Sequence, residues 1–443
     1  MTSGIAPLTG TTAEQVGKRI VVIDQTAPGG VTATGALKET YFGSIPAERL
    51  LMAHHTGMHD RITLRAGLQA GFGKARIYRG TERSLSLIRA FQPDLLIYRP
   101  LPTAPLLHHL ACTLALEDGV PLLLWFMDDW PERLRATSPA EADAIERDLR
   151  RLAQRASGCF AISASMASAF HERYGGPPYQ VAHNGVRPED WSFPRIPRSE
   201  NDPILLRYSG ALAPDMSLAS MISLAQAVSK LAASGKPVQL EIRTQKTWLR
   251  QYAHKFRSLP GVSIGSASGS QADYRRWIAG ADIGIIAYNF DDETIRYTRY
   301  SFANKLPELM AAGSAVLAIG PTDIETIRSL QTHGVAAIAN RPDVLPEVLL
   351  DLVNNPARRH ALAAAAQEYA KLLTLDAVRQ AMEVHLGGSS PADAGVPDAV
   401  SLIRRSPRAP GTEARDWLHI RLRYLKWAYA RLRALPHTLR GKA

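Results

Sequence analysis

Residues 300–321 read YSFANKLPELMAAGSAVLAIGP, and their pattern predicts a loop, a short helix, a turn and a buried strand. Asn304 is the expected N-cap, because an Asn side chain accepts a hydrogen bond from the first free backbone donors of a helix. Pro307 falls in the first turn, where proline is tolerated, and Gly313 is the expected left-handed residue that ends the helix. The apolar run 314–319 is typical of a parallel strand that is covered on both faces.

The loop before this helix carries the candidate chemistry. Backbone N–H groups and the positive end of a helix dipole bind anions at such a place, and Lys305 adds a full charge. The donors would come from Ser301, Asn304 and the backbone between them. Glu308 lies one turn into the helix, where its carboxylate would accept hydrogen bonds from vicinal hydroxyls such as those of a ribose. The alternative is an ordinary helix–strand unit in which this carboxylate is only solvated.

The same residues resemble the donor-nucleotide signature of the GT-B glycosyltransferases, in particular the large retaining group called family 4. That signature runs roughly Lys-x-x-Glu-x-Met-Ala-x-Gly-x-Pro-Val-Leu-Ala. The matching positions are Lys305, Glu308, Met310, Ala311, Gly313, Val316, Leu317 and Ala318. Ala315 replaces the usual proline, and Tyr300 stands where the family commonly has a Glu that contacts the donor sugar. The resemblance implies a GT-B fold with a nucleotide-sugar donor at this site and transfer with retention of configuration.

Length and composition bound the class of protein. At 443 residues, 46% of them apolar, the chain is long enough for two domains with real cores. Cys112 and Cys159 both lie in apolar segments and are expected to be buried free thiols of a reducing compartment. The sequence shows no signal peptide and no apolar run long enough to span a membrane, so the expected location is the cytoplasm.

Strands and helices alternate along the first half of the chain. Predicted strands occupy residues 19–24, 50–53, 75–78, 94–98, 121–126, 158–162 and 180–182, and helical patterns occupy 82–91, 105–117 and 140–156. This alternation predicts a parallel sheet with helices on both faces. Ligands of such sheets bind beyond the carboxyl ends of the strands. Gly29 and Gly30 follow the first strand, either as a plain turn or as a loop that faces the ligand.

A polar cluster follows the predicted strand at 121–126. Asp128, Asp129 and Trp130 come directly after it, and the place resembles the His-Asp-x-Trp-Pro of family 4, with Met127 instead of the His. The resemblance makes these residues part of the cleft, with Asp128 orienting the acceptor. Two alternatives stay open: an Asp caps the next helix, or the pair holds a divalent ion. The Asp-x-Asp spacing of metal-dependent transferases is absent.

A second alternation begins after a proline-rich segment. Predicted strands occupy residues 204–209, 239–243, 262–264, 281–286, 315–319 and 336–338, and predicted helices 345–354, 356–372 and 375–385. Gly210 matches the place where family 4 brings backbone to the donor diphosphate. The Arg and Lys that usually follow are absent, so Lys305, Arg299 and Arg296 are the expected cations. GT-B chains often end with a helix that crosses back onto the first domain, and the last predicted helix is the candidate.

The sequence therefore predicts an α/β protein with two Rossmann-like, doubly wound parallel-sheet domains that face a cleft. The expected parts are an acceptor-binding domain at 1–190, a linker at 191–203, a donor domain at 204–386, a flexible linker at 387–412 and a basic helix at 413–443. This last segment carries eight Lys or Arg and two acids, in a chain of net charge +11. Its amphipathic pattern indicates a helix that either lies on an anionic membrane surface or docks on protein.

The expected activity is transfer of a sugar, of the hexosyl type, from a nucleoside-diphosphate sugar to a saccharide or lipid-linked acceptor, in bacterial polysaccharide or glycolipid assembly. The assigned residues are Lys305 and Asp128 for catalysis; Glu308, Gly210, Ser301, Asn304, Arg299 and Tyr300 for the donor; and Gly29, Gly30, Asp129 and Trp130 for the acceptor side. No cofactor or metal is expected, because backbone groups and Lys305 can stabilise the leaving diphosphate. The alternative is a non-catalytic GT-B module that binds a nucleotide or polysaccharide. Nucleic acid is not an expected partner, since the basic tail lacks a base-reading pattern.

Overall fold

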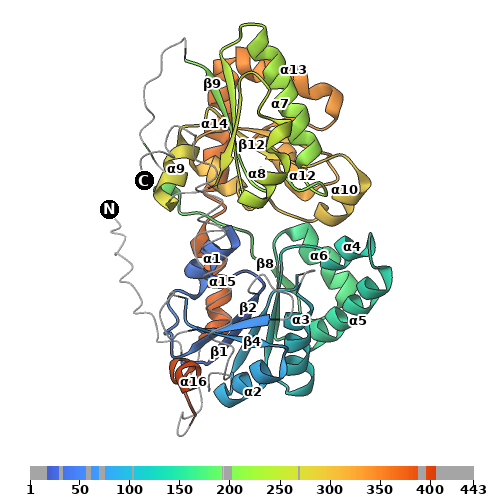
Figure 1. Ribbon diagram of the computed structural model, residues 1–443, viewed down its shortest axis with the longest axis vertical. Helices are drawn as coiled ribbons and strands as arrows, with labels where there is room; N and C mark the ends of the chain where they lie inside the picture. Colours follow the sequence, from blue (N-terminus) through green and yellow to red (C-terminus); the bar gives the residue numbers. More distant parts are fainter. Residues whose placement is uncertain are drawn as a thin grey trace, which may run out of the picture.

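The computed structural model describes residues 17–28, 33–55, 61–68, 75–101, 104–191, 193, 202–267, 270–387 and 396–405. Within these residues the chain forms two α/β domains, each built around one central sheet, which lie one above the other in Figure 1. The predicted fold class, two Rossmann-like domains that face each other, is confirmed.

The first domain is built on eight strands in the order β4-β3-β2-β1-β5-β6-β7-β8. Their bounds are β1 (Ile20–Ile23), β2 (Leu50–His55), β3 (Arg61–Ala66), β4 (Ala75–Arg79), β5 (Leu95–Tyr98), β6 (Leu122–Phe126), β7 (Gly158–Ala161) and β8 (Tyr179–Val181). Strand β3 is absent from the predicted strands, although its sequence RITLRA alternates as a strand does. It pairs antiparallel with both β2 and β4, so the expectation of a wholly parallel sheet is wrong at this edge. The reason is the short connections, because parallel neighbours need a crossover of about a dozen residues.

Helices cover both faces of this sheet. Their bounds are α1 (Ala33–Phe42), α2 (Glu82–Phe91), α3 (Pro105–Cys112) with the π turn η1 (Thr113–Glu117), α4 (Trp130–Arg135), α5 (Pro139–Arg155) and α6 (Ala164–Tyr174). Trp125, Phe126 and Phe160 are fully buried in the core between the layers. The carboxyl ends of β1, β5 and β6 point toward the second domain, where the chemistry of such sheets is found.

The second domain has six parallel strands in the order β11-β10-β9-β12-β13-β14. These are β9 (Ile204–Ser209), β10 (Val238–Thr244), β11 (Val262–Ser266), β12 (Ile283–Ala287), β13 (Ala315–Ile319) and β14 (Ala337–Ala339). The helices are α7 (Leu218–Ala233), α8 (Lys246–Tyr252), α9 (Gln271–Ala279), α10 (Asp292–Thr298), α11 (Leu306–Ala311), α12 (Glu325–His333), α13 (Leu345–Asn354) and α14 (Pro356–Ala370), with the 3₁₀ turns η2 (Pro188–Trp191), η3 (Ala253–Lys255) and η4 (Pro342–Val344). The strand order reverses beside β9, which opens a ligand crevice there.

The stretch at 300–321 folds as the predicted loop, helix, turn and strand. All five residues of β13 are buried, and Gly313 adopts a positive φ of 75°. The predicted N-cap is wrong, because α11 begins after Lys305 and no side chain caps it. Asn304 instead accepts a hydrogen bond from the side-chain amide of Asn184, which belongs to the first domain.

The last predicted helix crosses back onto the first domain, as expected. This helix is α15 (Leu375–Leu386), which lies beside α1 in Figure 1. The chain leading into it runs next to Val186, whose N–H donates to Leu373 O at 2.9 Å and whose carbonyl accepts from Leu375 N at 3.1 Å. Gly185 is required at this crossing, since an added Cβ would lie 2.6 Å from the Thr374 carbonyl carbon.

A short helix lies within the segment that the sequence predicts to be a flexible linker. This is α16 (Ala399–Arg405), which packs on α2 and β3 of the first domain. Ala399, Leu402 and Ile403 are buried, and Ala399 N donates to Glu48 O at 2.9 Å. The expectation of a linker is therefore wrong for this part, because these three residues form an apolar stripe at helical spacing. The predicted basic helix at 413–443 lies outside the described residues.

Candidate active site

A cavity of about 1170 Å³ lies between the two domains, at the carboxyl ends of both sheets. Its described lining carries six basic and four acidic residues: Arg99, Arg187, Arg243, Arg275, Lys305 and Arg379 against Glu39, Asp128, Asp190 and Glu308. A cleft lined by an excess of one sign of charge attracts ligands of the opposite sign. The cavity is therefore suited to an anionic molecule.

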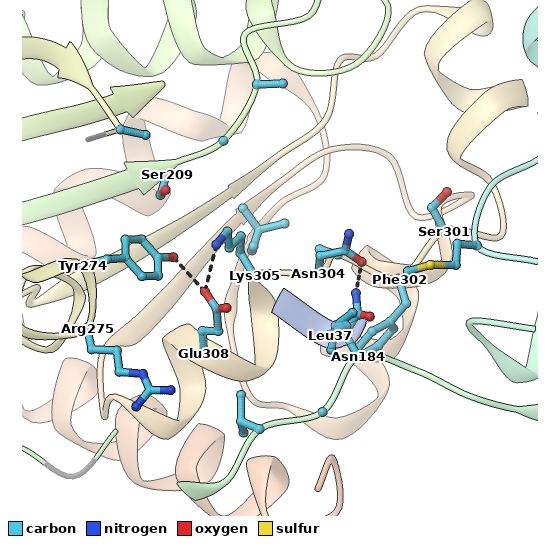
Figure 2. A pocket seen from close by; sticks show the side chains of 18 of the residues that line it. Leu37, Asn184, Ser209, Tyr274, Arg275, Ser301, Phe302, Asn304, Lys305 and Glu308 are labelled. Atoms are coloured by element: carbon cyan, nitrogen blue, oxygen red, sulfur yellow. Dashed lines mark hydrogen bonds and ion pairs between the residues drawn. The ribbon is translucent and has the colours of Figure 1, made fainter. Parts of the chain in front are cut away.

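Glu308 lines this cavity and is held by two neighbouring side chains. Tyr274 Oη donates a hydrogen bond to Glu308 Oε2 at 2.7 Å, and Lys305 Nζ lies 3.2 Å from the same oxygen. The Lys305 ammonium also lies 4.3 Å from the centre of the Tyr274 ring, a cation–π distance. Figure 2 shows the three side chains converging. Since Glu308 Oε1 accepts no hydrogen bond from the described residues, it can serve a ligand hydroxyl.

Tyr274 remains a neutral hydrogen-bond donor in this arrangement. Its burial raises the pKa of the phenol well above its usual value, and the Glu308 carboxylate raises that pKa further. The residue lies on α9, and it is 34 positions from Glu308 in the sequence. No local pattern signals such a distant pairing, so sequence reasoning missed it.

Two hydrogen bonds to the side chain of Thr326 hold the loop at 301–304. The hydroxyl of Thr326 accepts from Ala303 N at 3.0 Å and donates to Ser301 O at 2.8 Å. Ser301 and Asn304 both line the cavity, as predicted. Ser301 Oγ is buried and has no hydrogen-bond partner among the described residues, which leaves it for a ligand oxygen.

Gly210 lies in the cavity wall directly after β9. A Cβ added there would come within 2.7 Å of Tyr208 Oη, and this hydroxyl donates to Ala211 O at 2.6 Å. Glycine is needed because the tyrosine holds the following loop through that space. The position therefore brings bare backbone to the cavity, as the resemblance implies.

Family 4 usually has an Arg and a Lys after the position of Gly210, and this chain lacks both. A neighbouring strand places an arginine in the cavity wall. Arg243, near the carboxyl end of β10, lines the cavity, and its Cζ lies 4.1 Å from the centre of the Trp277 ring. Burial, and then the nearby Arg207, lower the pKa of Arg243. Two of the cations expected from the sequence do not reach the cavity. Arg296 and Arg299 are exposed and are not among the residues that line the cavity.

Tyr300 contacts the first domain and does not line the cavity. Its ring meets Phe170 edge-on at 6.0 Å, and its carbonyl accepts from Ser163 Oγ at 2.7 Å. The structure thus brings Glu308, Lys305, Ser301, Asn304 and Gly210 together, while Arg299 and Tyr300 lie outside the group. Tyr300 joins the two domains beside the site.

On the first-domain side, Asp128 lines the cavity, whereas Asp129 and Trp130 are buried away from it. Asp129 caps α4 by accepting from Glu132 N at 3.3 Å and pairs with Arg173 at 2.9 Å. Burial raises the pKa of Asp129 to about 6, with Arg173 acting in the opposite direction. The cap alternative therefore applies to Asp129, and its predicted cleft role is wrong, as is that of Trp130. The predicted positions Gly29 and Gly30 lie outside the described residues.

A buried charge cluster stands behind Asp128, and the sequence did not reveal it. Asp24 Oδ2 lies 2.7 Å from Lys38 Nζ and accepts from Arg99 Nε at 2.9 Å. Arg99 Nη2 also donates to Asp24 Oδ1 at 3.0 Å and to Thr26 Oγ1 at 3.1 Å. The register explains the meeting, because Ile23 and Tyr98 are paired in the sheet and Asp24 and Arg99 are the next residues.

The protonation of this cluster follows from its burial and its charges. Burial would raise the pKa of Asp24, but Arg99 and Lys38 together outweigh it and lower the pKa to about 2. Burial lowers the pKa of Lys38 to about 8, although Asp24 opposes the shift. Arg99 Nη1 faces Asp128 Oδ2 at 3.9 Å, so the cluster extends to the cavity.

Comparison with known proteins agrees with this geometry. Residues 56–190 match the family model described as Glycosyltransferase Family 4. HepE from Anabaena, solved with UDP-glucose, is 14% identical with a TM-score of 0.58, covering 83% of this chain and 99% of that chain. The α,α-trehalose 6-phosphate synthase from Burkholderia multivorans is 13% identical, with a TM-score of 0.56 over 83% and 98%. WaaG, a glycosyltransferase involved in lipopolysaccharide biosynthesis, is 14% identical, with a TM-score of 0.50 over 69% and 95%.

These likenesses show the fold, which is that of the GT-B glycosyltransferases. The resemblance noted from the sequence is confirmed. The family match falls in the first domain, whereas most of the motifs that carried the resemblance lie in the second. No curated protein sequence matches the chain.

Proposed function

We propose that the protein is a glycosyltransferase that moves a hexosyl group from a nucleoside-diphosphate sugar to an acceptor hydroxyl. One observation carries the proposal: Glu308, Lys305 and Tyr274 converge in a cavity between the two domains of a GT-B fold. A solvated surface carboxylate would not be held by a buried phenol and an ammonium at once.

The donor binds on the second domain in this proposal. Glu308 Oε1 accepts from the ribose hydroxyls, and the diphosphate lies against Lys305, Ser301 and the backbone at Gly210. Arg243, which also lines the cavity, adds a second cation near β10. The structure of HepE holds UDP-glucose, which supports a uridine nucleotide as the first donor to test.

The transfer needs charge stabilisation more than a strong base. The bond between the sugar C1 and the diphosphate oxygen breaks, and a bond from C1 to the acceptor oxygen forms. The acceptor oxygen attacks C1 from the face that the diphosphate leaves, which retains the configuration without a protein nucleophile. The acceptor proton passes to the leaving diphosphate, so a strong protein base is not required. Positioned donors and Lys305 stabilise the charge that develops on the diphosphate, and closing the cleft excludes water. Asp128 orients the acceptor hydroxyl, and no metal takes part.

The acceptor in this proposal is a saccharide or a lipid-linked saccharide of bacterial polysaccharide or glycolipid assembly. WaaG, a structural neighbour, is involved in lipopolysaccharide biosynthesis. The described residues include no helix that could cross a membrane. The basic segment 413–443, with eight Lys or Arg and two acids, would hold the enzyme on an anionic lipid surface, where each such charge contributes about 1 kcal/mol.

The experiment is a turnover screen over uridine- and other nucleoside-diphosphate sugars, in which the released diphosphate and the transferred sugar are both measured. At donor concentrations well below saturation, Glu308→Ala should release about 10- to 100-fold less than the natural chain, because its donor binding is weaker. Glu347→Ala is the matched control, because Leu345-Pro346-Glu347 repeats Leu306-Pro307-Glu308 at the start of a helix and Glu347 is exposed. Its turnover should equal that of the natural chain.

The alternative to this proposal is that the protein is a non-catalytic module that binds a nucleotide. Tyr300 favours this alternative, because it packs on Phe170 where the family commonly presents a Glu to the donor sugar. UDP would raise the unfolding temperature by mass action in both cases. Stabilisation by UDP without diphosphate release for any donor and acceptor would support the module and contradict the enzyme.

A further inference from the structure

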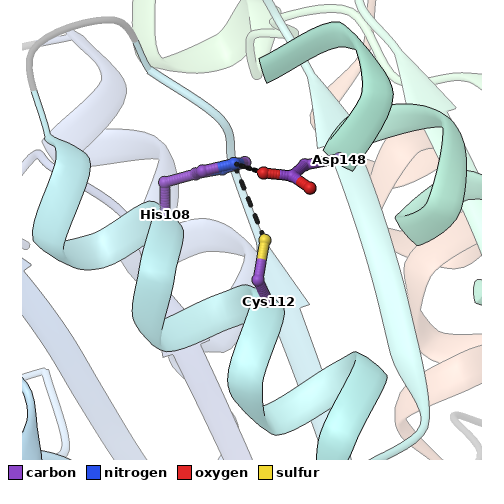
Figure 3. Close-up of side chains that lie close together, drawn as sticks. All are labelled: His108, Cys112 and Asp148. Carbon is purple, nitrogen blue, oxygen red and sulfur yellow. Dashed lines mark hydrogen bonds and ion pairs between the residues drawn. The ribbon is translucent and has the colours of Figure 1, made fainter. Parts of the chain in front are cut away.

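Three potential metal ligands meet in the first domain, outside the cleft. His108 and Cys112 lie one turn apart on α3, and Asp148 faces them from α5 (Figure 3). Their ligand atoms all lie within 4.8 Å of one another. None of the three is among the residues that line the cavity between the domains, so the cluster is separate from the proposed donor site.

The two separations measured from His108 are close to those between ligands of one zinc ion. His108 Nε2 lies 3.6 Å from Cys112 Sγ and 3.4 Å from Asp148 Oδ2. Bond lengths of about 2.0 Å for nitrogen or oxygen and about 2.3 Å for sulfur, at tetrahedral angles, give ligand separations of about 3.5 Å and about 3.3 Å. An ion would therefore enter between the three side chains with only small movements.

The surroundings orient the histidine and the carboxylate toward a common point. Tyr98 Oη lies 2.9 Å from His108 Nδ1 in the buried interior, so Nε2 is the nitrogen that faces Cys112 and Asp148. Arg151 Nη1 lies 3.5 Å from Asp148 Oδ1, which leaves Oδ2 directed at the histidine. Metal-binding histidines and carboxylates are held by such outer contacts.

The local backbone and exposure also suit an ion. The chain leaves α3 after Cys112 and enters the π turn η1, a rare feature that is frequent at functional sites. Cys112 is partly exposed, and the Asp148 side chain is 35% exposed. An ion can thus enter from solvent, and a water molecule can complete its coordination.

We propose that His108 Nε2, Cys112 Sγ and Asp148 Oδ2 bind one Zn²⁺, which links α3 to α5 with water as the fourth ligand. Thiolate and imidazole favour zinc over the harder magnesium and calcium ions. On binding, the Cys112 thiol proton passes to solvent and the Sγ–Zn bond forms. This assignment revises the expectation that Cys112 is only a free thiol, and it does not rest on the proposed function. The competing interpretation is a His–Asp pair beside an unrelated cysteine.

The test is zinc titration of the full-length protein after chelator treatment, with a chromophoric chelator as competitor. One equivalent of tight binding is expected, and Cys112→Ser, His108→Ala and Asp148→Asn should each abolish it. Tyr98→Phe should weaken it by about 10- to 100-fold, since it removes an outer contact. The matched controls are His109→Ala, an exposed histidine on the same helix, and Cys159→Ala, the other cysteine; both should bind like the natural chain.

Two further measurements keep the test decisive if a variant fails to fold. Co²⁺ bound to the natural chain should give the visible bands of a tetrahedral ion and a thiolate-to-cobalt band. Zinc should protect Cys112 from an alkylating reagent, while Cys159, at 1% exposure, does not react. Zinc binding equal in the natural chain and the Cys112→Ser variant, or cobalt spectra without a thiolate band, would overturn the site.

Discussion

The two walls of the cleft take their side chains from the sequence in different ways. The second-domain wall takes Ser301, Asn304, Lys305 and Glu308 from one stretch of eight positions. Gly210, Arg243 and Tyr274 join them from other elements. The first-domain wall joins Asp24 to Arg99, which are 75 positions apart, and adds Asp128 from a third strand end. A local motif can be recognised in a sequence, whereas a cluster made by sheet register becomes visible only when the strands are paired.

The walls also differ in what their charges do. Lys305 and Glu308 are partly exposed and face the cavity, so their loss should affect ligands more than folding. Asp24 and Lys38 are almost completely buried, so their loss should affect folding first.

The largest effect is expected for Asp24→Asn, which removes the counter-ion that the buried cations Lys38 and Arg99 share. The free energy of unfolding should fall by about 3–5 kcal/mol, measured by urea denaturation. The matched control is Asp118→Asn, which breaks a similar bidentate pair with Arg89 at 2.8 Å, on the surface. That change should lower the free energy of unfolding far less, because water screens an exposed ion pair, and equal losses in both variants would contradict the buried role.

The same variant has a defined pH dependence. The pKa of Asp24 is lowered from 3.8 to about 2, so its stabilising contribution is complete above the unfolded value and is lost as pH falls toward 2. The difference in unfolding free energy between the natural chain and Asp24→Asn should therefore shrink as pH falls from about 4 to about 2. A difference that stays constant down to pH 2 would refute the assigned ion pairing.

Lys305→Met should lower turnover by about 100- to 1000-fold, the usual effect of removing one group that stabilises developing charge. Donor affinity should change less, because the charge grows in the transition state. Lys371→Met is the control, since Lys371 also pairs with a Glu three positions away, on the surface.

Turnover should survive a chelator, even when the chelator strips zinc from the site at His108, Cys112 and Asp148. Activity lost in chelator and restored by Mn²⁺ or Mg²⁺ would reverse the metal-free mechanism.

Glu308→Ala should weaken nucleotide-donor binding by about 10- to 100-fold, because hydrogen bonds to a charged group contribute about 1.5–3 kcal/mol. The fold should be unaffected, since the carboxylate faces the cavity. Isothermal titration with UDP measures the change, with Glu347→Ala as the reference. An unchanged dissociation constant would remove the ribose assignment while leaving the fold assignment intact.

A smaller effect is expected for Tyr274→Phe, which removes the hydrogen bond to Glu308 but keeps the ring under Lys305. Donor affinity should fall several-fold, equivalent to about 1 kcal/mol. The control is Tyr369→Phe, which also loses one hydrogen bond, to Ser329 at 3.1 Å, away from the cavity. If Tyr274→Phe weakens binding as much as Glu308→Ala does, the tyrosine contacts the donor itself.

The smallest effect on catalysis is expected from removing the basic tail. A chain that ends at Arg405 keeps α16 docked on the first domain, whereas a cut at Gly387 would expose the surface that α16 covers. We expect normal turnover with a soluble acceptor but loss of salt-sensitive binding to anionic vesicles in a sedimentation assay. Equal vesicle binding by the natural chain and the chain that ends at Arg405 would leave docking on protein as the role of the tail.

Recognition from the sequence succeeded where the signal was local. The stretch at 300–321 was predicted as loop, helix, turn and strand from its spacing, while the resemblance to family 4 singled out its Lys and Glu as candidate donor residues. The strands of the second domain were likewise predicted from periodicity, whereas the crossing of α15 onto the first domain was expected from the resemblance to GT-B chains. Asn304 failed as an N-cap because its side chain is bonded to Asn184 of the other domain, a contact that no local rule contains.

The sequence by itself determined the two-domain α/β class, because helix, turn and strand patterns depend on neighbours a few positions apart. Its local motif carried the GT-B resemblance and made Lys305 and Glu308 the candidate site residues. Only the tertiary structure decided that Asp129 caps a helix while Asp128 faces the cleft, that Arg243 lines the cavity, and that Asp24, Lys38 and Arg99 meet. The physical reason is that these contacts are set by strand register and domain packing. Both join residues whose separation along the chain carries no information about their distance in space.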